Sequence, residues 1–322
     1  MNETVSISLV IPSYNRAPLI GDTIAAALNQ QQPFAEIVVV DDGSTDDTVA
    51  RLSRFGDRIT LIRSPRSGVQ QARNTGVAAC TSEYVALCDS DDLLDPAFSS
   101  QMSRAALEQP MTDIWYCNFT LFSGDQVHSD KLALAPNGFL DGADHGQGYC
   151  VNIPALYTRV LQYQPFFPTG SLIRKSFYEA IGGYDSRFNG VGSEDFEFLL
   201  RSLSSGRLGY VTVPLASVRK HEGNDSRDNL RSLIGEAKIL EHSLALHPGA
   251  TRHSEAILAS IDKRRRAAFD IAYARGDFTA VRDTADQLSK PPTDTNFRLK
   301  QAISSFPPIL RHVAWRISQS VH

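Results

Sequence analysis

The sequence predicts an α/β fold with a doubly wound, mainly parallel central sheet, followed by an all-helical C-terminal extension. Three observations predict it. Over about the first 125 residues, short apolar runs alternate with segments of helical spacing, as in sheets whose strands are joined by crossover helices. The runs are too apolar for half-exposed strands and are typical of strands covered on both faces. After residue 225 only helical periodicity remains.

The elements follow in order along the chain. Strands are expected at residues 6–12, 36–41, 58–62, 83–88, 113–122, 172–174 and 208–213. Helices are expected at residues 15–32, from 45, at 69–80, from 95, and at 176–181, 193–205, 230–246, 254–275 and 278–288. Residues 124–168 break this rhythm and predict a functional loop or lid. We therefore expect one domain over residues 1–224 and a helical extension over 225–322.

Composition narrows the class of protein. The 322 residues hold 32 Lys+Arg against 36 Asp+Glu, a net charge of −4 that argues against a nucleic-acid binder. No apolar run approaches the roughly 18 residues of a membrane span, and the first residues lack the pattern of a secretory signal. The four cysteines are irregularly spaced, which predicts buried, reduced thiols. We expect a cytoplasmic protein.

Carboxylates follow three of the predicted strands at the point where each strand ends. These segments are Pro12-Ser13-Tyr14-Asn15, Asp41-Asp42-Gly43-Ser44 and Asp89-Ser90-Asp91-Asp92. In an open α/β sheet, ligands bind beyond the carboxyl ends of the strands. Like charges held close together are costly, and Mg²⁺ or Mn²⁺ relieves them by binding one or two carboxylates together with phosphate oxygens. The pattern favours a metal-bound phosphate ester, although each segment alone also fits a turn or a helix cap.

Six motifs occur in a fixed order over about residues 5–225. They are Val10-Ile11-Pro12-Ser13-Tyr14-Asn15, Val39-Val40-Asp41-Asp42-Gly43-Ser44-Thr45-Asp46, Gly68 to Gly76 with Ala72-Arg73-Asn74, Asp89-Ser90-Asp91-Asp92, Gly182-Gly183-Tyr184-Asp185 and Glu194-Asp195. Each motif alone is weak, but in this order they make the chain resemble a bacterial family 2 glycosyltransferase of the GT-A fold. The resemblance implies a nucleotide-diphospho-sugar donor, with UDP as the nucleotide, and a nucleotide-sugar-binding and catalytic domain over residues 1–224.

The resemblance also implies roles for single residues. The donor would be held by Pro12, Ser13, Tyr14, Asn15, Asp42, Arg73, Asp91 and Glu194. Tyr14 would pack on the base and Asp42 would accept a hydrogen bond from it, which suits uracil because its imide N–H is a donor. Arg73 would meet the nucleotide or its diphosphate, or form an ion pair with a strand-end aspartate.

The same resemblance implies a divalent cation, Mn²⁺ or Mg²⁺. Asp92 would bind the metal and Asp91 would face the ribose. Asp91, Asp89 and His221 are further candidate metal ligands. A lone histidine is more often structural, and that alternative stays open for His221. The segment around it would form a lid over the donor.

The catalytic base implied by the resemblance is Asp195. A carboxylate at a helix N-terminus is favoured in its ionised form, which a general base requires. One base and one displacement invert the anomeric centre. The acceptor would be a hydroxyl of a glycan or of a lipid-linked molecule, in cell-surface polysaccharide synthesis. Glu194 and Asp195 also fit as simple helix-capping acids.

Two other functions remain as alternatives. A sugar nucleotidyltransferase has a similar sheet, but the segment after the first strand is not its Gly-rich phosphate loop. A phospho-receiver signalling domain resembles Val40-Asp41-Asp42, but would be complete within about 120 residues and leave Glu194-Asp195 unexplained. A Rossmann dehydrogenase is excluded because G-x-G-x-x-G is missing after the first strand.

Two further segments have two interpretations each. The basic cluster at 263–266 and the mixed apolar and cationic segment at 306–316 fit either peripheral contact with the inner face of the cell membrane or a solvated face packed on the domain. The aromatic residues between 149 and 167 fit either a platform for the acceptor sugar or a core.

Overall fold

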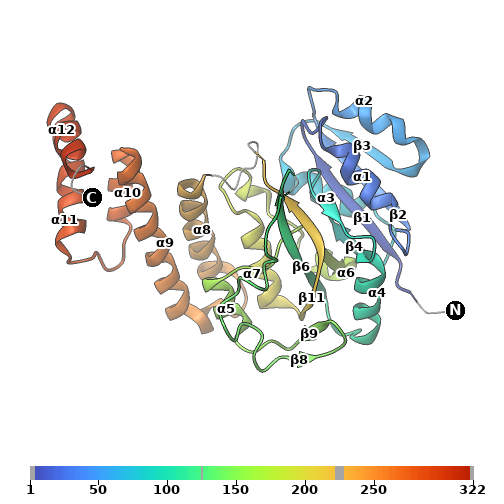
Figure 1. The fold of residues 1–322 in the computed structure, drawn as a ribbon. Helices are drawn as coiled ribbons and strands as arrows, with labels where there is room; N and C mark the ends of the chain where they lie inside the picture. Colours follow the sequence, from blue (N-terminus) through green and yellow to red (C-terminus); the bar gives the residue numbers. More distant parts are fainter. Residues whose placement is uncertain (1–3, 125, 222–227, 320–322) are drawn as a thin grey trace. The chain divides into compact units, whose positions relative to one another are not determined.

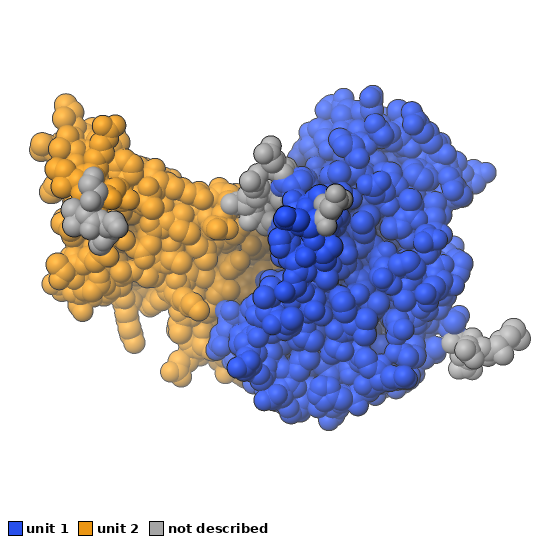
Figure 2. All heavy atoms as spheres, in the orientation of Figure 1, with its two compact units in different colours: residues 1–190, 197–224 blue, residues 191–196, 225–322 orange. Residues whose placement is uncertain are grey.

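The computed structural model describes residues 4–124, 126–221 and 228–319 (Figure 1). The predicted domain boundary at 224/225 and residues 222–224 of the predicted lid around His221 lie outside these residues. The chain divides into two compact units, coloured in Figure 2: residues 1–190 with 197–224, and residues 191–196 with 225–322. The short segment 191–196 is thus grouped with the C-terminal helices, although it lies within the N-terminal part of the sequence.

One mixed sheet forms the centre of the first unit. Its strand order is β3-β2-β1-β4-β10-β6-β11-β9-β8, with β5 paired to β11 and β7 to β6. The strands are β1 (Ile7–Ser13), β2 (Glu36–Asp42), β3 (Thr60–Ser64), β4 (Tyr84–Leu87), β5 (Leu93–Leu94), β6 (Ile114–Ser123), β7 (Gln126–Val127), β8 (Asp144–His145), β9 (Tyr149–Val151), β10 (Ser171–Arg174) and β11 (Leu208–Arg219). Strands β1 to β4 are parallel, as are β6 and β11, and the remaining pairings are antiparallel, so the predicted α/β class is confirmed with a mixed sheet.

Helices cover both faces of this sheet. Successive side chains of a strand point to opposite faces, and β1 shows the consequence. Leu9 packs in the core that includes α1 and α4, whereas its neighbour Val10 faces α3. A Cβ added to Gly76 of α3 would lie 2.3 Å from Val10 Cγ1, so only glycine permits this approach. The helices of this unit are α1 (Ile20–Leu28), α2 (Thr48–Leu52), α3 (Val69–Ala79), α4 (Phe98–Glu108), α5 (Leu156–Gln162), α6 (Lys175–Ala180) and α7 (Asp195–Ser205, whose first two residues are grouped with the second unit), with 3₁₀ helices at Ser53–Arg58 and Ser186–Phe188.

Strand β10 interrupts the parallel order, running antiparallel between β4 and β6. Gly170, which precedes it, has φ +98°, and an added Cβ would lie 2.6 Å from the sulfur of Cys117. The close packing of this turn places Thr169 beside the end of β4, where its hydroxyl accepts a hydrogen bond from the Asp89 N–H at 2.9 Å.

The segment 126–168 is more regular than the sequence predicts, because it contains β7, β8, β9 and α5. Its aromatic residues fill the core. Tyr149, Tyr157 and Phe166 are buried, and Phe166 makes an edge contact with the Tyr210 ring, with centroids 5.4 Å apart. These three therefore support the core interpretation rather than a sugar platform. All four cysteines are free and buried, as expected.

The second unit is helical, as predicted for this part of the chain. Its helices pack in sequence order around a core that includes Phe269, Tyr273 and Phe297. They are α8 (Asn229–Leu246), α9 (Ser254–Arg275), α10 (Phe278–Asp286), α11 (Thr295–Ser304) and α12 (Pro308–Gln319), with a 3₁₀ turn at Ala250–His253. Among the described residues, no helix is both long and apolar enough to span a membrane.

The basic cluster at 263–266 lies on α9. Arg264, Arg265 and Arg266 each form an ion pair with a carboxylate of the same unit. This cluster therefore supports the interpretation of a face packed on the protein.

Candidate functional site

Five aspartates lie at the end of β2 or just after β4, and we call them the acidic edge: Asp41, Asp42, Asp89, Asp91 and Asp92. The sheet brings their segments to one side because β1 lies between β2 and β4 and is parallel to both. Ser13 pairs with Asp41, and Val10 pairs with Leu87 two residues before Asp89. The strand ends thus meet beside the Tyr14–Asn15 turn, as the sequence predicts.

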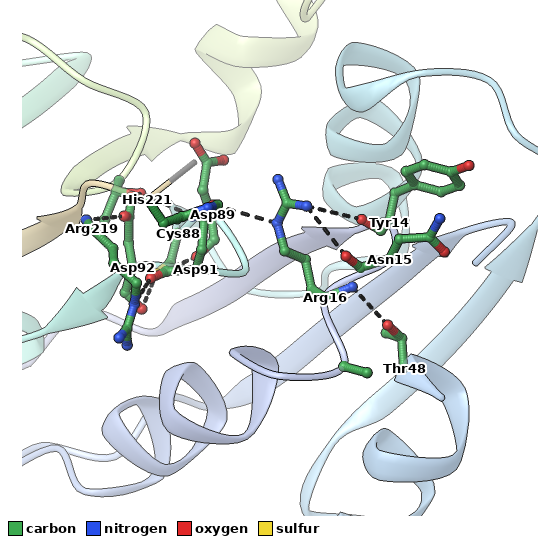
Figure 3. Close-up of polar contacts among 12 residues, drawn as sticks. Tyr14, Asn15, Arg16, Thr48, Cys88, Asp89, Asp91, Asp92, Arg219 and His221 are labelled. Atoms are coloured by element: carbon green, nitrogen blue, oxygen red, sulfur yellow. Dashed lines mark hydrogen bonds and ion pairs between the residues drawn. The ribbon is translucent and has the colours of Figure 1, made fainter. Parts of the chain in front are cut away.

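Two of these aspartates each offer a carboxylate oxygen without a partner. Asp91 contacts His221 Nε2 at 2.8 Å and Arg16 Nε at 3.4 Å, both through Oδ2 (Figure 3). Asp89 contacts Arg73 Nη2 at 2.7 Å through Oδ1. Within the described part of the chain, Asp91 Oδ1 and Asp89 Oδ2 accept no hydrogen bond. Oxygens of this kind, together with an imidazole, are a donor set that a divalent cation can use.

Asp92 is held differently. Its side chain is buried, and each carboxylate oxygen accepts a hydrogen bond: Oδ2 from the Thr169 hydroxyl at 2.6 Å and Oδ1 from the Arg219 N–H at 2.9 Å. Burial, and then the charges of Asp91 and Asp89, raise the pKa of Asp92 well above its usual value. Burial is the larger cause of the raised pKa, and the charges of Asp91 and Asp89 add a second contribution, which a cation would reduce.

Several hydrogen bonds hold the turn after β1 in place. Asn15 has φ +50°, and its side-chain oxygen accepts a hydrogen bond from the Thr45 N–H at 2.8 Å. The Arg16 N–H donates to the Thr48 hydroxyl at 2.8 Å. The guanidinium of Arg16 lies between the carbonyl groups of this turn and Asp91, so it connects the ends of β1 and β4 (Figure 3). Pro12 and Ser13, the last residues of β1, are buried.

Tyr14 and Asp42 are both occupied by the segment before α3. The guanidinium carbon of Arg66 lies 3.2 Å from the centre of the Tyr14 ring, a cation–π contact. Asp42 accepts hydrogen bonds from the Ser67 N–H and hydroxyl through Oδ1, at 2.7 and 2.9 Å, and from the Gly68 N–H through Oδ2 at 2.8 Å. Asp42 therefore anchors the loop that carries Arg66 over Tyr14.

Arg73 lies on α3 and is buried. It pairs with Asp89, which is the ion pair that the sequence left open as an alternative, and its guanidinium carbon lies 5.0 Å from the centre of the Tyr184 ring. Asn74 fixes Tyr184: its side-chain amide donates to the Tyr184 carbonyl at 2.8 Å and accepts from the Tyr184 N–H at 2.9 Å. The Gly-Gly-Tyr motif thus supports Arg73 at the acidic edge.

Glu194 and Asp195 belong to the second unit. They are the two central residues of a turn in which the Ser193 carbonyl accepts a hydrogen bond from the Phe196 N–H at 2.9 Å. Asp195 begins α7. Both side chains are partly exposed, and the turn presents two adjacent carboxyl groups at a helix N-terminus.

Sequence reasoning missed roles for three residues of the site. Arg16 contacts Asp91, Thr169 binds Asp92, and the Arg219 side chain donates to the Asp91 carbonyl at 2.9 Å. Arg16 had a local signal, because it is a cation that directly follows the turn facing the aspartates. Thr169 had none, because its place depends on the antiparallel insertion of β10.

Comparison with known proteins adds three findings. The family model "Glycosyl transferase family 2" matches residues 8–179. The putative glycosyltransferase EpsH of Bacillus subtilis is 32% identical over 252 residues, covering 76% of this chain and 68% of EpsH. The putative teichuronic acid biosynthesis glycosyltransferase TuaG of the same organism is 30% identical over 139 residues, covering 40% of this chain and 53% of TuaG.

A solved structure has the same fold. The crystal structure of S. aureus TarS in complex with UDP superposes with a TM-score of 0.62 at 16% identity, covering 98% of this chain and 92% of the TarS chain. TarS has also been solved with UDP-GlcNAc. The predicted GT-A architecture is therefore confirmed.

Proposed function

Because the chain belongs to glycosyl transferase family 2, we propose that it transfers a sugar from a UDP-sugar to a hydroxyl of a glycan or lipid-linked acceptor, with inversion at the anomeric carbon. The observation that carries the proposal is the acidic edge, with Asp91 against His221 beside the turn after β1. The UDP and UDP-GlcNAc complexes of TarS support a UDP-linked donor, and the name of TuaG supports a role in cell-surface polysaccharide synthesis. Family membership also sets aside the nucleotidyltransferase and phospho-receiver alternatives.

The acidic edge fits a divalent cation, Mn²⁺ or Mg²⁺. Asp91 and His221 would hold it, with the open Oδ2 of Asp89 as a third donor. Asp92, which the resemblance puts first as the metal ligand, has the loop-anchoring role in this proposal, because Thr169 and Arg219 each donate a hydrogen bond to one of its oxygens. When bound, the cation neutralises charge that develops on the leaving diphosphate.

The donor lies along the ends of β1 and β2. Tyr14 offers its ring to the base, and the Arg66 guanidinium either moves aside or packs on the other face of the base. Oδ2 of Asp42 accepts only the Gly68 N–H and can accept a further hydrogen bond, so the carboxylate can bind the imide N–H of uracil while it still holds Ser67 and Gly68. Arg73 and Arg16 add positive charge where the diphosphate meets the aspartates.

Asp195 acts as the general base. It removes the proton of the acceptor hydroxyl as that oxygen attacks the anomeric carbon and the bond to the diphosphate breaks. Its position at the start of α7 favours the ionised carboxylate. Glu194, next to it in the turn, would accept a hydrogen bond from the donor sugar.

Asp195→Asn tests this role, because it keeps the size of the side chain and removes the base. We expect UDP to bind in the presence of Mn²⁺ with unchanged affinity, measured by calorimetry. We expect UDP release from the UDP-sugar that the wild type cleaves fastest, with water as acceptor, to fall by at least about 100-fold. Glu179→Gln, on the surface of α6, is the control and should retain full activity. Full activity of the Asp195 variant would remove Asp195 from the mechanism.

We also propose that α12 contacts a membrane surface, which suits a lipid-linked acceptor. One face of α12 packs on α9 through Trp315, whose Nε1 donates a hydrogen bond to the Tyr273 carbonyl at 2.7 Å. The other face is apolar and exposed: Ile309, Leu310, Val313 and Ile317 are 80%, 61%, 55% and 62% exposed. Arg316 lies in the last turn of the helix, which contains no acidic residue, so anionic lipid headgroups are favoured, whereas the Arg311 guanidinium packs over the Phe278 ring.

A further inference from the structure

An ion pair in the helical unit contacts both ends of the turn that contains Asp195. Glu236 of α8 and Arg264 of α9 form the pair, with Arg264 Nε 2.6 Å from Glu236 Oε2. Both side chains are largely shielded from solvent, at 21% exposed for Glu236 and 13% for Arg264. A pair at this depth with a short, charge-assisted hydrogen bond has well-defined geometry, unlike exposed surface pairs.

Each member of the pair also contacts one outer residue of the turn. The second carboxylate oxygen of Glu236, Oε1, accepts a hydrogen bond from the Ser193 hydroxyl at 3.0 Å. The guanidinium of Arg264 lies over the ring of Phe196, with its carbon 5.4 Å from the ring centre. Ser193 and Phe196 are the residues whose backbone hydrogen bond closes the turn, and Glu194 and Asp195 lie between them.

The backbone before the turn packs directly on α8. Gly235 is adjacent to Glu236, and a Cβ added to it would lie 2.4 Å from the Gly192 carbonyl oxygen and 2.5 Å from that of Val191. Ser193 itself has φ +54°, a conformation that non-glycine residues rarely adopt and that surrounding contacts must stabilise. Close backbone packing and the ion pair therefore both act on the same short segment.

We propose that Glu236 and Arg264 are positioning residues for Asp195, so that the C-terminal helical unit sets the geometry of the catalytic turn. This inference rests on the proposed function, because it takes Asp195 as the base. The pair does not touch the donor in this role. It fixes the two ends of the turn, and a base misplaced by about 1 Å can cost about 100-fold in rate.

Glu236→Gln is the test variant. It keeps the oxygen that accepts from Ser193, but it removes the charge that pairs with Arg264 and turns an amide donor toward a guanidinium donor. Glu241→Gln is the matched control, because Glu241 pairs with Arg265, the next residue of α9, and lies on the same helix as Glu236. Asp195→Asn is measured beside them.

We expect Glu236→Gln to lower kcat for UDP release from the preferred UDP-sugar by about tenfold or more, with the affinity for UDP and Mn²⁺ unchanged. Amide hydrogen exchange in residues 191–196 should become faster in this variant and not in Glu241→Gln. Ser193→Ala, which leaves the ion pair intact, should show a smaller loss of kcat with the same unchanged affinity.

Each contrary result is distinct. If Glu236→Gln matches Glu241→Gln in kcat and exchange while Asp195→Asn is inactive, the positioning role is wrong and the base assignment stands. If Glu236→Gln lowers UDP affinity and kcat together, the pair has only a structural role. If Asp195→Asn is fully active, the proposed base fails, whatever the Glu236 variant shows.

Discussion

At the scale of single residues, position beside a strand end predicts more of the site than residue type does. Asp42, Asp89 and Asp91 could be located from the sequence because each lies within three residues of the end of an apolar run, and the sheet does bring those runs together. Their partners could not be located. The hydroxyl of Thr169 binds Asp92 across 77 residues of sequence, and only the turn before β10 explains why.

A carboxylate away from the site offers a pH test of the sheet. Glu36 starts β2, and its Oε1 accepts hydrogen bonds from the Ser8 hydroxyl at 2.6 Å and from the Thr81 N–H at 2.6 Å and hydroxyl at 2.9 Å. Burial acts to raise the pKa of Glu36, but these hydrogen bonds together outweigh it, so the pKa is lowered. The charged form is thus favoured by the fold.

A carboxylate whose pKa is lowered by folding stabilises the folded state at pH values above its unfolded-state pKa. This stability is lost as the pH falls through the folded-state pKa. We expect Glu36→Gln to cost about 1 kcal/mol near pH 7, a loss of about 2–4 °C in Tm. The difference from wild type should shrink when thermal unfolding is measured below pH 4. Glu108→Gln, at the exposed end of α4, should change Tm little at either pH. A deficit in Glu36→Gln that is equal at both pH values would show that its charge is not the cause.

At the scale of elements, periodicity predicts long segments better than short ones. Strands β1, β2 and β4 and helices α3, α8 and α9 lie close to where their patterns predict, because each fills a face with apolar residues. The short elements β8, β9 and α5 lie in a segment rich in Gly, Asp and Pro, and the sequence assigned no structure there. The spacing of apolar residues also does not show which strands pair with one another. The antiparallel pairing of β10 therefore could not be predicted.

For helix α12, we predict binding to anionic vesicles through its exposed apolar face. In flotation with vesicles that contain phosphatidylglycerol, the wild-type chain should float, and the double variant Ile309→Asp with Ile317→Asp should not. Vesicles of phosphatidylcholine alone should bind the wild type weakly, because the charge contribution is then missing. Val127→Asp, which charges an apolar residue that is 70% exposed on the first unit, is the control and should float. Equal flotation of wild type and the double variant would exclude α12 as the contact.

At the scale of the whole molecule, the sequence predicts the two-part composition of the chain but not which part holds the turn with the proposed base. Residues 191–196 precede α7 in sequence, so a linear division assigns them to the sheet domain. By packing they belong with the C-terminal helices, because Gly235 permits α8 to approach their backbone. Deleting the C-terminal helices would therefore remove the α8 residues that contact the turn, Gly235 and Glu236.

We propose above all that a cation held by Asp91 and His221 binds the diphosphate of the donor. Calorimetric titration of UDP with and without Mn²⁺ tests it most directly, on wild type, Asp91→Asn and Asp92→Asn, with folding checked by Tm. We predict that Mn²⁺ strengthens UDP binding at least about tenfold in the wild type, that Asp91→Asn abolishes this gain and that Asp92→Asn retains much of it. UDP affinity that is the same with and without Mn²⁺ in the wild type would contradict the claim.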